Sequence, residues 1–194
     1  MTSHSNTYFE ILHCARRLLI LGGYNGFSYA DIAESVKIRK ASIHHHFPTK
    51  VDLVRTLVEL YRKEAEAGIA ALERHFPDPD AQLRAYIGYW LGCIGDAEKG
   101  YCVCALLASQ IPVLPEDVCK EVRAHFQTLS AWLTSVLERG AQEGRVRLAS
   151  DARAEAEVFM ATVHGAMLSA RAYGDSQMFG VITQPLLQRL VSEH

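Results

Sequence analysis

The sequence predicts an all-α protein of about nine helices. Strict alternation of apolar and polar residues, the pattern of a β-strand, is rare along the chain. Ala, Leu, Glu and Arg, which favour helices, dominate the long segments between Gly and Pro breaks. With 194 residues, the chain is long enough for one large domain, or for one small and one medium domain.

The first helix is expected over residues 7–21. Apolar side chains recur on one of its faces, as they do on an amphipathic helix that packs against a core. Gly22 and Gly23 then end the helix, because glycine readily adopts the left-handed conformation that a helix C-cap favours.

A second helix is expected to begin after Ser28. The Ser28 side chain can cap the free backbone amides, and Asp31 is placed to complete a capping box. Phe27, just before the cap, can pack on Ile32 one turn into the helix. A turn is expected to follow at residues 36–38.

A short third helix is expected over residues 39–46. Pro48 ends it, because the residue that precedes a proline avoids helical geometry. Thr49 then caps a fourth helix, with Asp52 at its third position, and this helix continues to about His75.

The remainder of the chain predicts five further helices separated by Gly or Pro. They are expected at residues 79–97, 102–110, 115–142, 151–173 and 177–191. Pro185 lies inside the last of them, and it predicts either a kink or two shorter pieces.

Charge is distributed unevenly along the chain, whose formal net charge is −2. Residues 1–50 contain six basic and three acidic residues, whereas the remainder contains fourteen and nineteen. A basic amino-terminal segment on an acidic remainder suits a DNA contact confined to one end, because phosphate contacts supply much of the affinity for DNA.

Neither membrane insertion nor secretion is indicated. No apolar run approaches the roughly 18 to 20 residues that span a bilayer, and the first residues lack the basic and then apolar pattern of a signal peptide. We therefore expect a cytoplasmic protein with no membrane partner. Five cysteines without paired spacing are expected to be reduced thiols: Cys14, Cys93, Cys102, Cys104 and Cys119.

Several spaced positions near the first turn form a recognisable pattern. They are Gly26–Phe27–Ser28, Asp31–Ile32–Ala33, Lys40, Ser42, Ile43 and Phe47–Pro48–Thr49–Lys50. This pattern resembles the TetR family of bacterial transcriptional regulators over about residues 8–60. The resemblance implies a three-helix, helix-turn-helix DNA-binding head at residues 1–48 and a helical effector-binding and dimerisation body at residues 49–194.

The resemblance also implies a function. It is that of a transcriptional repressor that binds double-stranded, palindromic operator DNA as a homodimer, without a cofactor. A small-molecule inducer, or modification of a cysteine, would release the DNA. The residues that the resemblance places at the DNA are Ser28, Tyr29, Arg39, Lys40, Ala41, Ser42, His44, His45 and Lys50.

The chain departs from the family pattern at three of these or neighbouring positions. Lys37 stands where the turn usually has Gly, so a left-handed conformation there would cost about 1 kcal/mol. Arg39 replaces the usual small capping residue, and its charge opposes the helix dipole by about 0.3 to 1 kcal/mol. His44 stands where a Tyr is common, so operator preference cannot be copied from a relative.

A ligand cavity is expected between the body helices, lined by apolar groups with a few polar anchors. Its candidate lining residues are Trp90, Phe126, Phe159 and Met167, with His125 or His164. Other aromatic residues of this region, Trp132 among them, default to core positions.

Cys102 and Cys104 are candidates for sensing. Residues 100–109 are similar to a TetR branch with Gly-Cys at this point, and some members of that branch respond to electrophiles through a cysteine. A helix N-terminus would favour the thiolate of Cys102. The alternative is that both cysteines are small buried core residues.

A dimer interface is expected on the last two helices. Small residues on the first of them and apolar residues on the second are the candidates: Thr162, Gly165, Ala166, Ser169, Phe179, Ile182, Leu186 and Leu190. Paired across a two-fold axis, they would form a four-helix bundle. Packing within one subunit is the alternative.

Two other functions have less support. His44, His45 and His46 are adjacent on a helix and point about 100° apart, so they cannot converge on one metal ion. A small all-helical enzyme or ligand carrier without DNA binding would leave residues 26–50 unexplained. The sequence also contains no Gly-rich phosphate loop, paired helical metal ligands or nucleophile elbow to support it.

Overall fold

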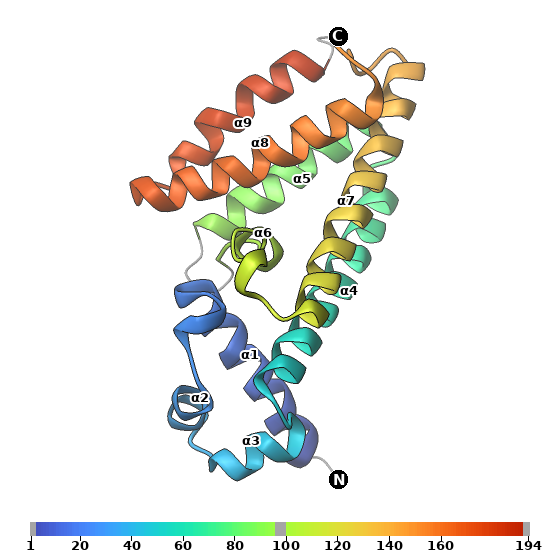
Figure 1. Cartoon of the computed structure of the whole chain (residues 1–194). Helices are drawn as coiled ribbons and strands as arrows, with labels where there is room; N and C mark the ends of the chain where they lie inside the picture. The colour runs from blue at the N-terminus through green and yellow to red at the C-terminus, as the bar shows by residue number, and fades with distance from the viewer. Residues whose placement is uncertain (1–2, 96–99, 192–194) are drawn as a thin grey trace. The chain divides into compact units, whose positions relative to one another are not determined.

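The structure is a computed structural model and describes residues 3–95 and 100–191 (Figure 1). Within these residues the secondary structure is helical, apart from an isolated antiparallel bridge between Val146 and Val191. The elements are α1 (Ser3–Gly22), η1 (Tyr24–Gly26), α2 (Tyr29–Val36), α3 (Lys40–His46), α4 (Lys50–His75), α5 (Pro79–Ile94), α6 (Val103–Ala108), η2 (Ile111–Val113), α7 (Glu116–Gln142), α8 (Ala152–Tyr173) and α9 (Gln177–Leu190). The predicted all-α fold with about nine helices is therefore confirmed.

Most predicted boundaries agree with the structure to within a few residues. α6 is shorter than predicted, because Cys102 is its N-cap and a separate 3-10 turn, η2, follows it. α9 continues through Pro185 as a single helix. The predicted end of the fifth helix, at residue 97, lies outside the described residues.

The chain forms two compact units, each made of segments that are distant in sequence. The first unit comprises Met1–Glu64 and Cys102–His125, and the second comprises Ala65–Tyr101 and Phe126–His194. This division differs from the boundary expected at residues 48–49. The first part of α4, all of α6 and the start of α7 belong with the amino-terminal helices.

The first unit is built around apolar side chains that α1, α2, α3 and α4 contribute. Its completely buried residues include Ile11 and Leu19 of α1, Ile32 of α2, Ile43 of α3 and Leu53 of α4. Burying a side chain of this size contributes about 1.5 to 3 kcal/mol. The short helices α2 and α3 are therefore held by packing, since helices of this length are not stable alone.

The α6 segment is fixed to the first unit where α1 ends. α6 packs against α1, and the backbone N–H of Tyr24 donates to Gln110 Oε1 at 2.9 Å. Gly23 has a φ of 73°, and a side chain at this position would clash with that of Gln110. The backbone conformation therefore requires glycine, and any side chain here would also displace that of Gln110.

The second unit is built on α8 and α9, which lie side by side (Figure 1), and on α5, which packs against both. Phe159 of α8 and Phe179 of α9 are completely buried. Arg189 of α9 donates two hydrogen bonds to Glu155 of α8, at 2.9 and 3.2 Å. These bonds lower the pKa of the Glu155 carboxyl, which lies almost wholly out of solvent.

Candidate nucleic-acid interface

α2 begins with the predicted capping box. The Ser28 hydroxyl accepts a hydrogen bond from the backbone N–H of Ala30 at 3.2 Å, and the Asp31 carboxylate accepts one from the backbone N–H of Ser28 at 2.7 Å. Hydrogen bonds from the Ser28 side chain and backbone lower the pKa of Asp31. The box fixes the residue at which α2 starts.

Lys37 ends α2 in the left-handed conformation, with φ 59° and ψ 43°. Its backbone N–H bonds to the Ala33 carbonyl and so closes the last turn of the helix. Among the described residues other than glycine, Lys37 alone has a positive φ. The structure therefore places Lys37 in the left-handed conformation whose cost was put at about 1 kcal/mol.

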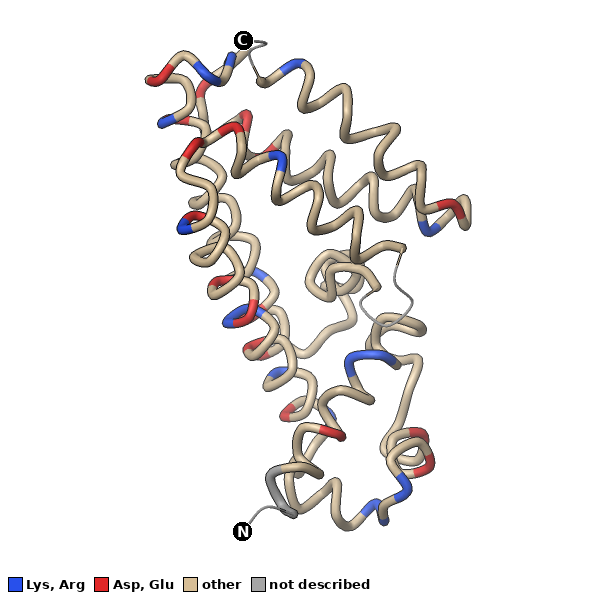
Figure 2. The backbone as a smooth tube through the Cα atoms, turned by 180° about the vertical axis from the view of Figure 1, so that it is seen from behind, with Lys and Arg blue, Asp and Glu red and all other residues tan. Residues whose placement is uncertain are grey.

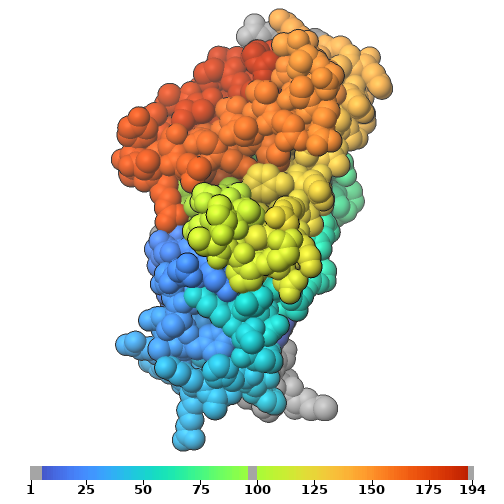
Figure 3. All heavy atoms as spheres, in the orientation of Figure 1, coloured from blue at the N-terminus to red at the C-terminus, as the bar shows by residue number. Residues whose placement is uncertain are grey.

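α3 begins without a side-chain cap. Arg39 is the N-cap, and no capping hydrogen bond involves its side chain. On the inner face, Ile43 is completely buried and Phe47, at the C-cap, is 2% exposed. The exposed side chains are those of Arg39, Lys40, Ala41, His44 and His45. In Figure 3, light-blue side chains from this part of the chain protrude from the surface of the first unit.

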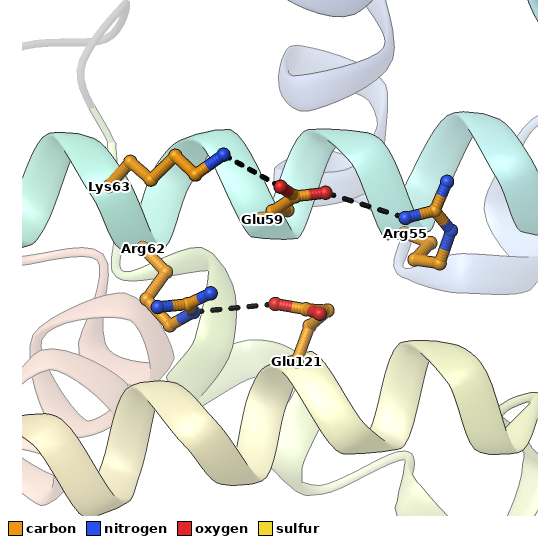
Figure 4. A network of polar contacts seen from close by, with 5 residues as sticks. All are labelled: Arg55, Glu59, Arg62, Lys63 and Glu121. Carbon is orange, nitrogen blue, oxygen red and sulfur yellow. Dashed lines mark hydrogen bonds and ion pairs between the residues drawn. The ribbon is translucent and has the colours of Figure 1, made fainter.

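Three basic side chains of α4 in the first unit form ion pairs with acidic neighbours. Glu59 pairs with Lys63 at 2.7 Å and with Arg55 at 3.4 Å on the same helix. Arg62 pairs with Glu121 of α7 at 3.3 Å (Figure 4). The hydrogen bond from Lys63, followed by its charge, lowers the pKa of Glu59. These three cations are thus already engaged in ion pairs within the unit.

The basic side chains at the start of α3 differ from those of α4. Within residues 3–95 and 100–191, Lys37, Arg39 and Lys40 form no ion pair, and all three are exposed. The three residues lie within four positions of one another, from the C-cap of α2 to the first residue of α3, and Figure 2 colours such basic positions blue. The first unit therefore presents a compact group of unneutralised charge at the turn that leads into α3.

Tyr29 of α2 supports the end of α3 and contacts His44 there. The Tyr29 hydroxyl donates to the Phe47 carbonyl at 2.8 Å, and its ring contacts the His44 ring edge-on at 4.8 Å. His44 Nδ1 lies 3.1 Å from the Pro48 carbonyl, which can only accept, so Nδ1 carries the proton. Burial, and then the charge of Asp52, raise the pKa of Tyr29 to about 12. Tyr29, expected at a phosphate, has its hydroxyl engaged inside the unit.

Lys50 was also expected at a phosphate, and the structure places its ammonium inside the unit. Lys50 Nζ donates to the Phe27 carbonyl. It lies over the Phe27 ring at 4.1 Å and over the Tyr24 ring at 5.0 Å. Burial lowers the pKa of this lysine. In this structure Lys50 ties the start of α4 to the segment before α2.

The nine predicted DNA residues thus fall into two groups. The exposed ones are Ser28, Arg39, Lys40, Ala41, His44 and His45, and the half-buried ones are Tyr29, Ser42 and Lys50. Lys37 joins the exposed group, although the sequence analysis treated it only as a turn residue. Its closeness in sequence to Arg39 and Lys40 was the signal that could have identified it.

The two candidate sensing cysteines lie in the first unit with His125. Cys102 Sγ is 3.8 Å from His125 Nε2 and accepts from the Ala105 backbone N–H at 3.4 Å. Both Cys102 and Cys104 are completely buried. Burial raises the pKa of Cys102, and it raises that of Cys104 well above its usual value. The expectation of a favoured Cys102 thiolate is therefore wrong, because removal from water outweighs the dipole of the six-residue α6.

The other candidate ligand residues lie in the second unit. They are Trp90, Phe126, Phe159, His164 and Met167. Phe126 is half-buried, its ring 5.2 Å from that of His164, and the others are at most 8% exposed. His125 was expected among them, whereas it belongs to the first unit.

Half of the predicted dimer residues are core residues of the second unit. Ala166, Phe179, Leu186 and Leu190 are at most 7% exposed, so they have little surface left for a second copy. Their assignment to the interface is corrected, because α8 and α9 bury these faces against the rest of the unit. Gly165 is exposed, and Thr162, Ser169 and Ile182 are half-buried.

The outer faces of α8 and α9 carry apolar side chains that the sequence analysis did not select. Val158 and Leu168 of α8 are 47% and 45% exposed, and Val181 of α9 is 61% exposed. They share this side of α8 with the exposed Ala161 and Gly165. The two helices therefore do carry an apolar surface, in a different register from the predicted one.

No group of three or more His, Cys, Asp or Glu side chains in the described part of the chain is arranged to hold a metal ion. None of the described helices combines the length and the apolarity that a membrane span requires.

The first unit carries the features of a helix-turn-helix. A capped α2, a tight left-handed turn and a cationic, solvent-facing α3 on a buried inner face form the element that enters the major groove in many transcriptional regulators. The class of protein is therefore that of DNA-binding transcriptional regulators.

Comparison with known sequences identifies the family. The model described as bacterial regulatory proteins, tetR family, matches residues 11–57, and the model described as the tetracyclin repressor-like C-terminal domain matches residues 79–185. The two matches together cover most of the chain. The protein belongs to the TetR family of transcriptional regulators, a family of DNA-binding proteins rather than of known enzymes.

Solved structures and named relatives agree with this assignment. A TetR-family transcriptional regulator from Agrobacterium tumefaciens is 65% identical, with a TM-score of 0.96 over 98% of this chain and 100% of that chain. A TetR regulator from Legionella pneumophila is 26% identical, with a TM-score of 0.84 over 93% and 95%. The HTH-type transcriptional regulator CymR from Pseudomonas putida is 26% identical over 136 residues, 69% of this chain and 67% of that protein.

Proposed function

We propose that this protein is a transcriptional repressor that binds a palindromic operator as a homodimer and leaves it when a small molecule binds. The observation that carries the proposal is the exposed charge of Arg39 and Lys40, which has no acidic partner among the described residues. It lies at the start of a helix whose opposite face is fixed in the core by Ile43.

The side chains at the start of α3 suit major-groove recognition. A guanidinium such as that of Arg39 can donate two hydrogen bonds to guanine, a contact that discriminates between bases by about 1 to 3 kcal/mol. The ammonium groups of Lys37 and Lys40 suit phosphates. The Nδ1–H of His44 donates to the Pro48 carbonyl. In the neutral ring, Nε2 is then an acceptor for an adenine or cytosine amino group.

A homodimer would explain the apolar outer faces of α8 and α9. Val158, Leu168 and Val181 are large apolar residues exposed on neighbouring helices. The exposed Gly165 lies on α8 between the first two, where a small residue permits close approach of a second helix. An isologous contact through these faces would bring four helices together. Two copies of α3 could then meet the two halves of a palindrome.

Release by a small molecule would depend on a difference in ligand affinity between the DNA-binding arrangement and another. α4 supports such coupling, because one continuous helix supplies residues 50–64 to the first unit and residues 65–75 to the second. We do not extend the proposal to cysteine modification, since Cys102 and Cys104 are buried thiols with raised pKa values.

The proposal is tested by selecting bound fragments from genomic DNA and measuring their affinity by fluorescence anisotropy. We expect enrichment of a palindrome whose half-sites are centred about 34 to 36 Å apart, or a multiple of this distance. The control is the same fragment with both half-sites scrambled but with unchanged length and composition. Equal affinity for the two fragments at all salt concentrations would refute a sequence-specific regulator of this kind.

A further inference from the structure

Both tryptophans of the chain lie in the second unit, and both have a buried N–H without an acceptor. Trp90 of α5 is 6% exposed and Trp132 of α7 is 8% exposed. Among the described residues, neither indole Nε1 has a hydrogen-bond partner, and neither atom is reached by solvent. Native proteins leave few buried donors unpaired, and each such donor calls for an explanation.

The two indoles belong to one aromatic cluster, in which the Tyr86 ring lies next to three others. The Tyr86 ring centroid lies 6.4 Å from that of Trp90, 5.4 Å from that of Trp132 and 6.2 Å from that of Phe159. The cluster therefore joins α5, α7 and α8 within one unit. Each of the two unpaired donors can bond an acceptor that comes from outside the protein.

The helix that carries Trp90 is poorly stabilised on either side of it. Gly88 and Gly92 lie two residues before and after Trp90, and glycine inside a helix lowers its stability. A side chain at either position would meet no other atom within 4 Å. Close packing therefore does not require these glycines, and their effect is to make this part of α5 easier to open.

We propose that Trp90 and Trp132 form a ligand subsite for an uncharged, largely apolar molecule with a hydrogen-bond acceptor, such as a ketone, ester or amide carbonyl. The carbonyl oxygen accepts from an indole N–H, while the apolar part of the ligand packs on the aromatic rings. The subsite rests on the proposed function, because its occupant is the inducer. Entry requires the α5 segment around Trp90 to move aside.

The surroundings of the two indoles favour an uncharged ligand. The Tyr86 ring lies against both indoles and against Phe159, and indole N–H groups are neutral donors. A ligand carboxylate held by these donors would be a buried charge without a countercharge, which is strongly disfavoured.

The test uses nuclear magnetic resonance of the intact, 15N-labelled protein without DNA. With only two tryptophans, the spectrum has two indole N–H signals, which the variants Trp90→Phe and Trp132→Phe assign. The probes are 1-tetralone and tetralin, which share a ring system but differ in the carbonyl, and benzyltrimethylammonium as a cationic probe. We expect 1-tetralone to move at least one indole proton downfield and to bind about tenfold more tightly than tetralin.

The matched variants separate hydrogen bonding from packing. Replacing the tryptophan whose signal moves by Phe should reduce the preference for 1-tetralone over tetralin to less than about twofold, with tetralin affinity little changed. Three results would overturn the subsite: unmoved indole signals at millimolar 1-tetralone, equal affinity for the two neutral probes, or tighter binding of the cation. Because no DNA is present, such a failure leaves operator binding standing. A failed DNA selection, in turn, leaves the indole shifts intact.

Discussion

The two units of the molecule leave different groups without partners, and each group indicates what the unit binds. In the first unit the unpartnered groups are the exposed cations Arg39 and Lys40, which suit a polyanion in water. In the second unit they are the buried, uncharged N–H groups of Trp90 and Trp132, which suit an uncharged acceptor. What a fold leaves unpaired is therefore as informative as what it pairs.

The second unit also leaves apolar surface exposed on α8 and α9. A charge placed on this surface is expected to have the largest effect of the variants described below. Val181 on α9 is 61% exposed, so Val181→Asp should leave the subunit folded but place a charge in the proposed interface. We expect the dimer dissociation constant to rise at least about a hundredfold. Light scattering after gel filtration measures it.

Val113 provides the control for this prediction, since it is 62% exposed on η2 of the first unit. Val113→Asp should leave the molecular mass at twice that of one chain. If Val181→Asp remains dimeric while Val113→Asp dissociates, the interface does not lie on α8 and α9.

Variants of Arg39 test whether this residue weakens the start of α3 while it strengthens DNA binding. Arg39→Ser supplies the missing N-cap of α3 and should raise the free energy of unfolding by about 1 kcal/mol. The same change removes a cation and should weaken operator binding about tenfold. Arg39→Ala is the control, because it should lose affinity without gaining stability. Urea unfolding and fluorescence anisotropy measure the two effects, and a serine variant that binds DNA normally would contradict the role of Arg39.

Glu155 makes the stability of the second unit depend on pH. Its pKa in the folded protein is lowered by the hydrogen bond from Arg189, so the bond stabilises the fold fully above the unfolded value of about 4.3. The stabilisation is lost as pH falls through the lower folded value. Glu155→Gln should therefore cost about 1 to 2 kcal/mol at pH 7 and progressively less towards pH 3. Urea midpoints across this range measure it, with the exposed Glu138→Gln as control.

The smallest expected effect concerns the backbone at Lys37. Lys37→Gly should raise the free energy of unfolding by up to about 1 kcal/mol, because glycine adopts the left-handed conformation without strain. Lys37→Ala removes the same charge but keeps the strain, so it separates the two causes. Urea unfolding measures the free energy of unfolding of both variants. Equal values for the Gly and Ala variants would show that the conformation is not strained.

Local signals made the first unit the more predictable of the two. The Ser28–Asp31 capping box depends on residues three apart and is found as expected. The Thr49–Asp52 pair likewise forms reciprocal hydrogen bonds at the start of α4. Such contacts follow from the helix itself and need no knowledge of the tertiary fold.

Long-range packing explains what the sequence could not provide. Phe179 and Leu190 look the same in sequence whether α9 turns them toward its own unit or toward a second copy. Only the packing of α9 on α8 shows that they are core residues. The inward position of Lys50 Nζ depends on Phe27, which is distant in sequence. The unpaired state of the Trp132 N–H depends on three helices at once.

The measurement that tests the central claim most directly is the salt dependence of operator binding by Arg39→Ala/Lys40→Ala. Each lost phosphate contact should lower the slope of log K against log salt by about 1, so the double variant, which loses the phosphate contact of Lys40, should lose about 1. Arg74→Ala/Arg84→Ala removes two exposed cations of the second unit and should keep the wild-type slope. Equal slopes for all three proteins would contradict the account, because α3 would then not carry the DNA contact.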